Sequence, residues 1–211
     1  MAGKISIGNV HLDLGAGRRG VDMGPSAIHL AGLEQGLRDL GYQIDERYAL
    51  SIPSQEMAAV GDPAARFLEP IAQVCGQLAD RVAQAVRDGR MPLVLGGDHS
   101  VAIGTISGIA RAWRERGEKI GVIWVDAHTD MNTPQSSPSG NIHGMPLATL
   151  LGYGHPLLSA IVGEGAAIDP QNVCVIGARQ VDRAEVEVVR RATDLSRDRE
   201  GRLLFPEGSA S

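Results

Sequence analysis

Aromatic residues are scarce in this sequence: phenylalanine, tryptophan and tyrosine together make up only 3% of its 211 residues. Because 43% of the residues are nevertheless hydrophobic, the core must be built mainly from alanine, valine, isoleucine and leucine. A chain of this length can bury one sizeable core, and it requires no second domain.

Cysteines are few, and long apolar stretches and excess positive charge are missing. The two cysteines, Cys75 and Cys174, form no framework pattern, which is typical of a reducing compartment. The N-terminal MAGKISIGNV is unlike a signal peptide, and no apolar run approaches membrane-spanning length. The net charge is −5 and the isoelectric point is about 5.7. We therefore predict a cytoplasmic protein that binds neither nucleic acid nor a membrane.

Short apolar runs alternate with segments of helical periodicity along the chain. We predict strands at Lys4–Gly8, Met91–Leu95, Ile120–Val125 and Asn172–Ile176, and helices at Pro25–Leu40, Arg66–Arg87 and Ser100–Arg116. Strands that alternate with helices of this length predict a mostly parallel sheet covered on both faces. The predicted fold is therefore a three-layer α/β/α domain.

Polar clusters follow three of the predicted strands. The strand at 91–95 runs into GGDHS, the strand at 120–125 into DAHTD, and the strand at 172–176 into GARQVD. In open parallel sheets, ligands bind beyond the carboxyl ends of the strands. We therefore expect one rim of the sheet to gather five titratable residues, namely His99, Asp126, His128, Asp130 and Asp182.

The densest of these clusters holds Asp126, His128 and Asp130 at alternate positions. Two carboxylates and an imidazole this close together are costly unless a cation neutralises them, so a metal site is favoured over a polar strand end. Mixed carboxylate and imidazole ligands suit Mn²⁺, Fe²⁺ or Zn²⁺, and the majority of carboxylates favours Mn²⁺. The GGD sequence before His99, by contrast, is as typical of a simple strand-to-helix turn as of a functional loop.

Taken together, the motifs GGDHS, DAHTDMN and SPSGNIHGMP are similar to those of the ureohydrolase family, and most closely to arginases. The similarity extends through GRRGVDMGPSAI and IGARQVD, so it covers roughly residues 4–190. Agmatinase-like members share the metal motifs but lack the N-x(6)-SGN stretch that binds the α-carboxylate of an amino acid. Because Asn132, Ser139 and Asn141 are all present here, the resemblance favours arginase over agmatinase or formiminoglutamase.

This resemblance implies a binuclear manganese enzyme that hydrolyses L-arginine to L-ornithine and urea. His99, Asp126 and Asp130 would ligate the first Mn²⁺, and Asp126 would bridge to the second, which His128 also ligates. His143 would act as a catalytic proton shuttle, a role that suits the pKa range of histidine. Asp130 would count among the catalytic residues through its place in the metal centre.

The resemblance also implies a set of substrate-binding residues and an assembly. Four residues would hold the α-carboxylate of the substrate, namely Asn132, Ser137, Ser139 and Asn141. Asp182 would meet the α-ammonium group, with Glu185 acting through water. By the same resemblance, the protein would be a homo-oligomer, either a trimer or a hexamer.

The resemblance does not continue past residue 191. Arginases proceed through a further strand that ends in a D-x-D pair, whereas ATDLSRDREGRLLFPEGSAS contains no such strand or pair. We expect residues 1–191 to form an incomplete arginase-like domain without its C-terminal strands, and residues 192–211 to be an atypical, disordered tail. Two hypotheses stay open. The chain is either an arginase impaired by truncation, holding one Mn²⁺ or fewer tightly, or a non-catalytic fragment or pseudoenzyme.

Overall fold

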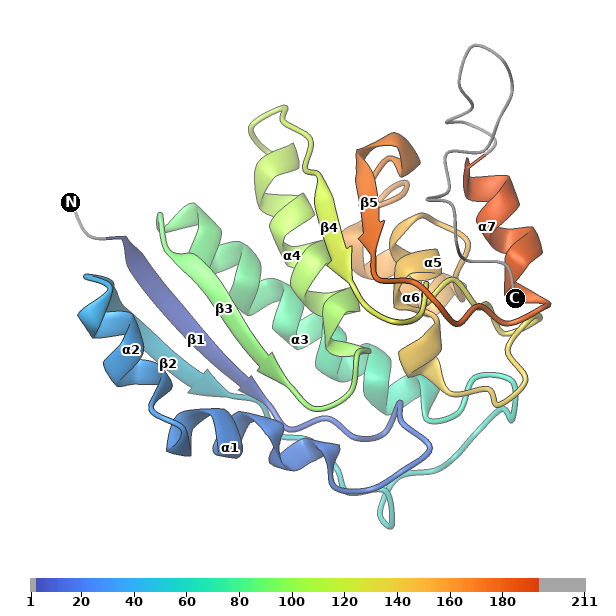
Figure 1. Cartoon of the computed structure of the whole chain (residues 1–211), viewed down its shortest axis with the longest axis horizontal. Coiled ribbons are helices and arrows are strands. Elements are labelled where there is room, and N and C mark those ends of the chain that lie inside the picture. Colours follow the sequence, from blue (N-terminus) through green and yellow to red (C-terminus); the bar gives the residue numbers. More distant parts are fainter. Residues whose placement is uncertain (1–2, 194–211) are drawn as a thin grey trace.

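The computed structural model of the chain describes residues 3–193, which form five strands and the helices around them (Figure 1). The strands are β1 (Lys4–Val10), β2 (Gln43–Ala49), β3 (Met91–Gly96), β4 (Val122–Val125) and β5 (Val173–Ile176). The α-helices are α1 (Gly24–Leu30), α2 (Leu33–Asp39), α3 (Leu68–Arg87), α4 (Val101–Arg114), α5 (Pro146–Leu150), α6 (Pro156–Ser159) and α7 (Glu185–Thr193). Short 3-10 turns lie at Val21–Met23, Ile142–Gly144, Ala160–Val162 and Pro170–Asn172.

The strands pair in two parallel ladders, one in the order β2-β1-β3 and the other joining β4 to β5. Every strand pairing within residues 3–193 is parallel, so the prediction of a mostly parallel α/β fold is confirmed. All four predicted strands are present within one or two residues of their expected ends. β2 was not predicted, because its sequence QIDERYA is largely polar and its side chains alternate between half-buried and exposed at the edge of the ladder.

The β2-β1-β3 ladder lies between two layers of helices. Ile5 and Ile7 of β1 are fully buried on one face, where Leu33 and Leu37 of α2 pack against them. Val10 belongs to the main core, which is dominated by the buried stripe of α3. This part of the chain therefore has the predicted three-layer architecture.

The predicted helix at Pro25–Leu40 is instead two helices, α1 and α2. Gly32 separates them with a left-handed φ of 93°, a conformation that glycine adopts without steric cost. The break turns α2 so that its apolar face lies on β1. The other two helix predictions are confirmed, since α3 and α4 occupy the expected segments.

Helices α3 and α4 make the most extensive contact between two helices in the described chain. A Cβ at Gly104 would lie 2.5 Å from the carbonyl oxygen of Cys75, and one at Gly108 would lie 2.5 Å from that of Ala79. The two glycines therefore let the backbones of α3 and α4 approach. The N-terminal end of α4, which follows His99, is positioned by this packing.

The β4–β5 ladder is covered on one face only by the described part of the chain. Trp124 is 3% exposed and packs with α4, α5 and α7. On the opposite face, Ile123 and Val125 are 71% and 74% exposed, and Ile176 is 49% exposed. Within residues 3–193, no helix has the length and apolar character needed to span a membrane.

The predicted tail begins at residue 192, but α7 continues to Thr193 and Ala192 is buried against the β4–β5 side of the core. The remainder of that predicted tail, residues 194–211, lies outside the described residues.

Candidate metal centre

The ends of β3, β4 and β5 bring the three predicted polar clusters to one cavity of about 280 Å³. This agrees with the position of ligand sites beyond the carboxyl ends of parallel strands. All the residues that the sequence predicted for metal binding, catalysis and substrate binding line this cavity, namely His99, Asp126, His128, Asp130, Asn132, Ser137, Ser139, Asn141, His143, Asp182 and Glu185.

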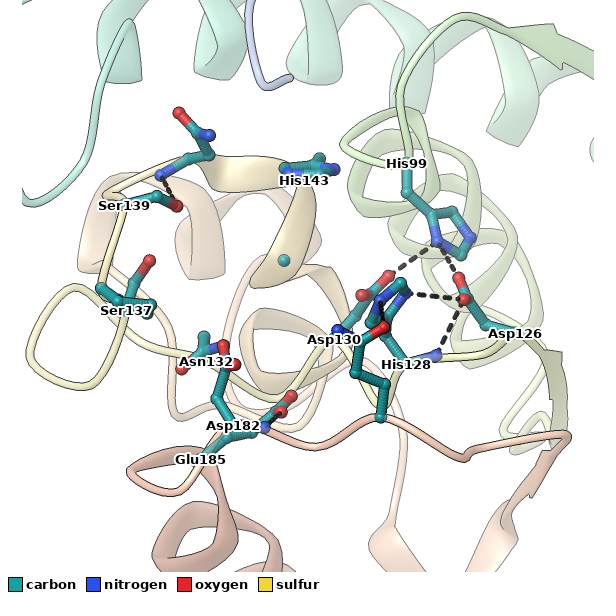
Figure 2. A pocket seen from close by; sticks show the side chains of 14 residues that line it. His99, Asp126, His128, Asp130, Asn132, Ser137, Ser139, His143, Asp182 and Glu185 are labelled. Carbon is teal, nitrogen blue, oxygen red and sulfur yellow. Dashed lines mark hydrogen bonds and ion pairs between the residues drawn. The ribbon is translucent and has the colours of Figure 1, made fainter. Parts of the chain in front are cut away.

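His99, Asp126 and Asp130 form a compact group of potential metal ligands at one side of the cavity (Figure 2). The His99 Nδ1 atom lies 2.9 Å from Asp126 Oδ2 and 2.7 Å from Asp130 Oδ2. One ligand atom from each residue can be chosen so that all three lie within 4.8 Å of one another. The His99 ring stacks on Trp124 with 4.4 Å between ring centroids, so the imidazole is fixed by a core side chain.

The buried atoms of this group suit a cation. Asp130 Oδ2 is buried, and the contact found for it in the described chain is His99 Nδ1, at 2.7 Å. Burial alone would lower the pKa of His99, but the carboxylates of Asp130 and Asp126 outweigh it and raise that pKa above its usual value. Partial burial alone would raise the pKa of Asp126, but the His128 backbone N–H and the His99 ring hold that pKa below its usual value. Two carboxylates that face one imidazole thus favour positive charge at this point, which is the condition that a bound cation would satisfy.

Asp126 lies between the two histidines. Its Oδ2 atom faces His99, while its Oδ1 atom accepts a hydrogen bond of 2.9 Å from the His128 backbone N–H and lies 3.3 Å from His128 Nδ1. The other ring nitrogen of His128 lies 3.2 Å from Gln180 Oε1. Gln180 was not predicted as a site residue, although it stands in the GARQVD motif and lines the same cavity.

Asp130 has an unusual backbone conformation, with φ at 50° in the left-handed region. Such a conformation is uncommon for residues other than glycine, although Asp tolerates it better than most. The Asp130 carbonyl oxygen accepts hydrogen bonds from Leu147 N and Ala148 N in the first turn of α5, at 3.0 and 3.2 Å. The fold thus fixes the direction of this carboxylate from the backbone side.

The opposite side of the cavity is a loop rich in hydroxyl and amide groups, which carries Ser137 and Ser139 (Figure 2). Ser137 Oγ accepts a hydrogen bond from Gly140 N, and Ser139 Oγ accepts one from Asn141 N. These bonds hold the loop in a turn and leave both hydroxyl hydrogens available to a ligand.

The segment after β5 joins this loop through Asp182. Asn132 Nδ2 donates a 2.9 Å hydrogen bond to Asp182 Oδ2, and Ser136 Oγ donates one of the same length to Asn132 Oδ1. Asp182 is exposed to the cavity, whereas Glu185 is 3% exposed. The two acidic residues, which the sequence assigned to one substrate group, therefore have different surroundings.

Asp98, in the GGD sequence whose role was left open, supports the loop beside His143. Its carboxylate accepts hydrogen bonds from Gly15 N at 2.8 Å, Ala16 N at 3.2 Å and Ser100 N at 2.9 Å. Burial raises the pKa of Asp98, and the Ser100 side chain together with the Ser100 and Gly15 N–H groups opposes that shift. The Gly15 carbonyl in turn accepts a bond from His143 N. Asp98 thus connects the turn after β3 to the backbone of His143.

Comparison with known proteins places these residues in a family context. The model of the arginase family matches residues 4–200. The arginase of Bacillus caldovelox is 49% identical over 187 residues, which cover 88% of this chain and 61% of that protein. A native structure of the B. caldovelox arginase superposes with a TM-score of 0.83 at 47% identity, covering 91% of this chain and 63% of that one.

A structure with lower sequence identity has a similar fold. The arginase of Entamoeba histolytica, solved in complex with L-ornithine, superposes with a TM-score of 0.79 at 31% identity, covering 90% of this chain and 62% of that one. The chain spans about three fifths of the length of the curated relatives it matches. Because the family match includes every strand-end motif that forms the cavity, the chain belongs to the arginase family.

Proposed function

We propose that this chain carries the metal-binding and substrate-binding centre of an arginase, which hydrolyses L-arginine to L-ornithine and urea with Mn²⁺. The observation that carries the proposal is the single cavity that joins three potential metal ligands to a loop of hydroxyl and amide groups. The L-ornithine bound to the E. histolytica relative supports the choice of substrate.

The metal would be held by His99, Asp126 and Asp130. Asp126 also faces His128, which supports the proposal that it bridges to a second Mn²⁺. A bound divalent metal lowers the pKa of its water ligand and so supplies a nucleophile near neutral pH. The carboxylate majority of the group favours Mn²⁺ over softer metals. His143 lines the cavity and would transfer a proton between this centre and the leaving amine.

The loop across the cavity would bind the amino-acid end of the substrate. Ser137 and Ser139 can donate their hydroxyl hydrogens to the α-carboxylate, together with the side chains of Asn132 and Asn141. The carboxylate of Asp182 lies beside this loop and would pair with the α-ammonium group. This arrangement would place the guanidinium group at the metal side, and it predicts a preference for arginine over agmatine, which lacks the α-carboxylate.

A non-catalytic, arginine-binding role is the second candidate. The described residues contain one group of three potential metal ligands. A second metal position would have only two ligands among the described residues, His128 and the shared Asp126. A second metal held this weakly would give low activity, because misplacing reacting groups by about 1 Å can cost about a hundredfold in rate.

One experiment separates these candidates. Urea release and calorimetric binding of L-arginine and agmatine are measured on the purified chain with Mn²⁺, beside an Asp126→Asn variant. Urea release that the substitution abolishes would identify an arginase, whereas arginine binding without urea release would identify the non-catalytic role. Equal binding of arginine and agmatine would contradict both.

The proposals of a homo-oligomer, trimeric or hexameric, and of a cytoplasmic location rest on the family resemblance and on composition. Light scattering of the purified chain tests the first of these. A single monomeric species at micromolar concentration would contradict it.

A further inference from the structure

Glu185 is the most deeply buried carboxylate that lines the cavity, and both of its oxygens are already bonded within the protein. The residue is 3% exposed. Its Oε1 atom accepts a short hydrogen bond from Thr129 Oγ1 and one of 2.7 Å from Met131 N. Its Oε2 atom accepts a 3.0 Å bond from Asp182 N. Three hydrogen-bond donors thus converge on one carboxylate. An ionised carboxylate can accept all three bonds, because both of its oxygens act as acceptors.

The two donors on Oε1 come from the residues on either side of Asp130. Thr129 precedes this metal ligand and Met131 follows it, and Asp130 itself has the left-handed φ of 50°. A non-glycine residue persists in such a conformation only where its surroundings fix it. Glu185 supplies one such restraint through Thr129 and Met131, in addition to the first-turn N–H groups of α5, which bind the Asp130 carbonyl.

The bond from Asp182 N has a second consequence. Asp182 lies three residues before Glu185, the first residue of α7, and its carbonyl accepts hydrogen bonds from Glu185 N and Val186 N, as that of an N-cap residue does. A glutamate three residues after an N-cap commonly accepts a hydrogen bond from the N-cap backbone N–H. Glu185 therefore caps α7 with one oxygen and holds the Asp130 segment with the other. The same side chain fixes the spacing between the metal ligand and Asp182, which faces the amino-acid end of the cavity.

We propose that Glu185 is a positioning residue for the metal centre: it holds Asp130 in its ligating conformation and couples that ligand to Asp182. This assigns it a different role from the water-mediated substrate contact that the sequence suggested. The inference rests on the proposed Mn²⁺ site. It deepens that site by naming a residue that sets metal affinity without touching the metal.

The test compares Glu185→Gln with Glu187→Gln, both on α7. Glu187 is the matched control, because its side chain is 59% exposed. Its one ion pair within the described residues is with Arg191, where Oε1 lies 3.3 Å from Nε. Glutamine at position 185 has one acceptor oxygen, so at least one of the three donors loses its partner and faces an NH₂ group. We expect the Mn²⁺ dissociation constant, measured by calorimetry, to rise about 10- to 100-fold in Glu185→Gln and to stay unchanged in Glu187→Gln.

A second variant, Thr129→Val, keeps the test decisive if Glu185→Gln does not fold. It removes only the hydroxyl donor beside Asp130 and leaves the cap of α7 intact. We expect the Mn²⁺ dissociation constant to rise about 10-fold, at the lower end of the range for such partners. A role in helix capping alone predicts a lower melting temperature for Glu185→Gln with unchanged Mn²⁺ affinity in both variants.

Each outcome separates this inference from the proposed function. Unchanged Mn²⁺ affinity with weakened arginine binding would overturn the positioning role and restore a substrate contact. Weakened Mn²⁺ affinity in a chain that binds no arginine would support the positioning role and contradict the arginase proposal. A wild-type chain that binds no Mn²⁺ would overturn both.

Discussion

Replacing Gly104 by alanine tests how the contact between α3 and α4 sets the position of the site. Gly104 lies in the contact between the two helices, and the added Cβ would lie 2.5 Å from the Cys75 carbonyl oxygen and 3.0 Å from Leu78 Cβ. The first distance is far inside van der Waals contact with a backbone atom that cannot rotate away. The helices must therefore separate, and the start of α4 beside His99 must move with them.

The change in the free energy of unfolding caused by Gly104→Ala follows from two opposing effects. Alanine gains about 1 kcal/mol of helix propensity over glycine, whereas overpacking a tight core contact costs roughly 1–3 kcal/mol. Because the clash is with backbone, we expect a cost in the upper part of that range, roughly 2–3 kcal/mol, so the free energy of unfolding should fall by roughly 1–2 kcal/mol. In a chain of this size, that loss lowers the melting temperature by roughly 2–8 °C.

The matched control is Gly76→Ala. Gly76 stands in the middle of α3, and a Cβ built there meets no atom within 4 Å. This substitution should keep the full propensity gain and stabilise the chain by up to about 1 kcal/mol. Both free energies are measured by urea denaturation followed by circular dichroism. If Gly104→Ala proves as stable as Gly76→Ala, the close approach of α3 and α4 is not what these glycines provide.

Three further predictions concern single side chains. Because burial raises the pKa of Cys75 to about 12 while Cys174 is exposed, Ellman's reagent should label one thiol of the native chain rapidly at pH 8 and the other only after denaturation; two rapid labels would contradict this. The raised pKa of His99 contributes stability that is present below its unfolded pKa of about 6.5 and is lost as pH rises through the folded pKa. The melting temperature of the metal-free chain should therefore fall over that pH range in the wild type but not in His99→Asn, and parallel curves would refute this. Asn132→Ala should weaken arginine binding by about 1.5–3 kcal/mol in calorimetry while agmatine binding stays unchanged, since a hydrogen bond to a charged group is lost.

The convergence of the metal ligands was predictable because it depends on topology alone. Parallel strands place their carboxyl ends at one edge, so the polar clusters were expected to meet there if the three strands were neighbours. For this reason His99 Nδ1 lies 2.9 Å from Asp126 Oδ2, although the two residues are 27 positions apart in the sequence. Because these residues are carboxylates and histidines, the sequence also indicated a divalent metal site.

Other features depend on contacts that no local pattern reveals. β2 escaped prediction because an edge strand with polar side chains lacks an apolar run. The break at Gly32 depends on how α2 packs on β1, and helical periodicity continues across it. The bond between Thr129 and Glu185 joins residues 56 positions apart, so the sequence could suggest a substrate role for Glu185 but not its burial.

The central claim is that His99, Asp126 and Asp130 hold a divalent metal, and the most direct test is Mn²⁺ binding measured by the electron paramagnetic resonance signal of the free ion. One group of three ligands is present in the described residues, so we predict one tightly bound Mn²⁺ per wild-type chain. Asp126→Asn should abolish tight binding, while Asp80→Asn, which changes an exposed carboxylate on α3, should leave it unchanged. Two tightly bound ions per wild-type chain, or the same affinity in Asp126→Asn as in the wild type, would contradict the account.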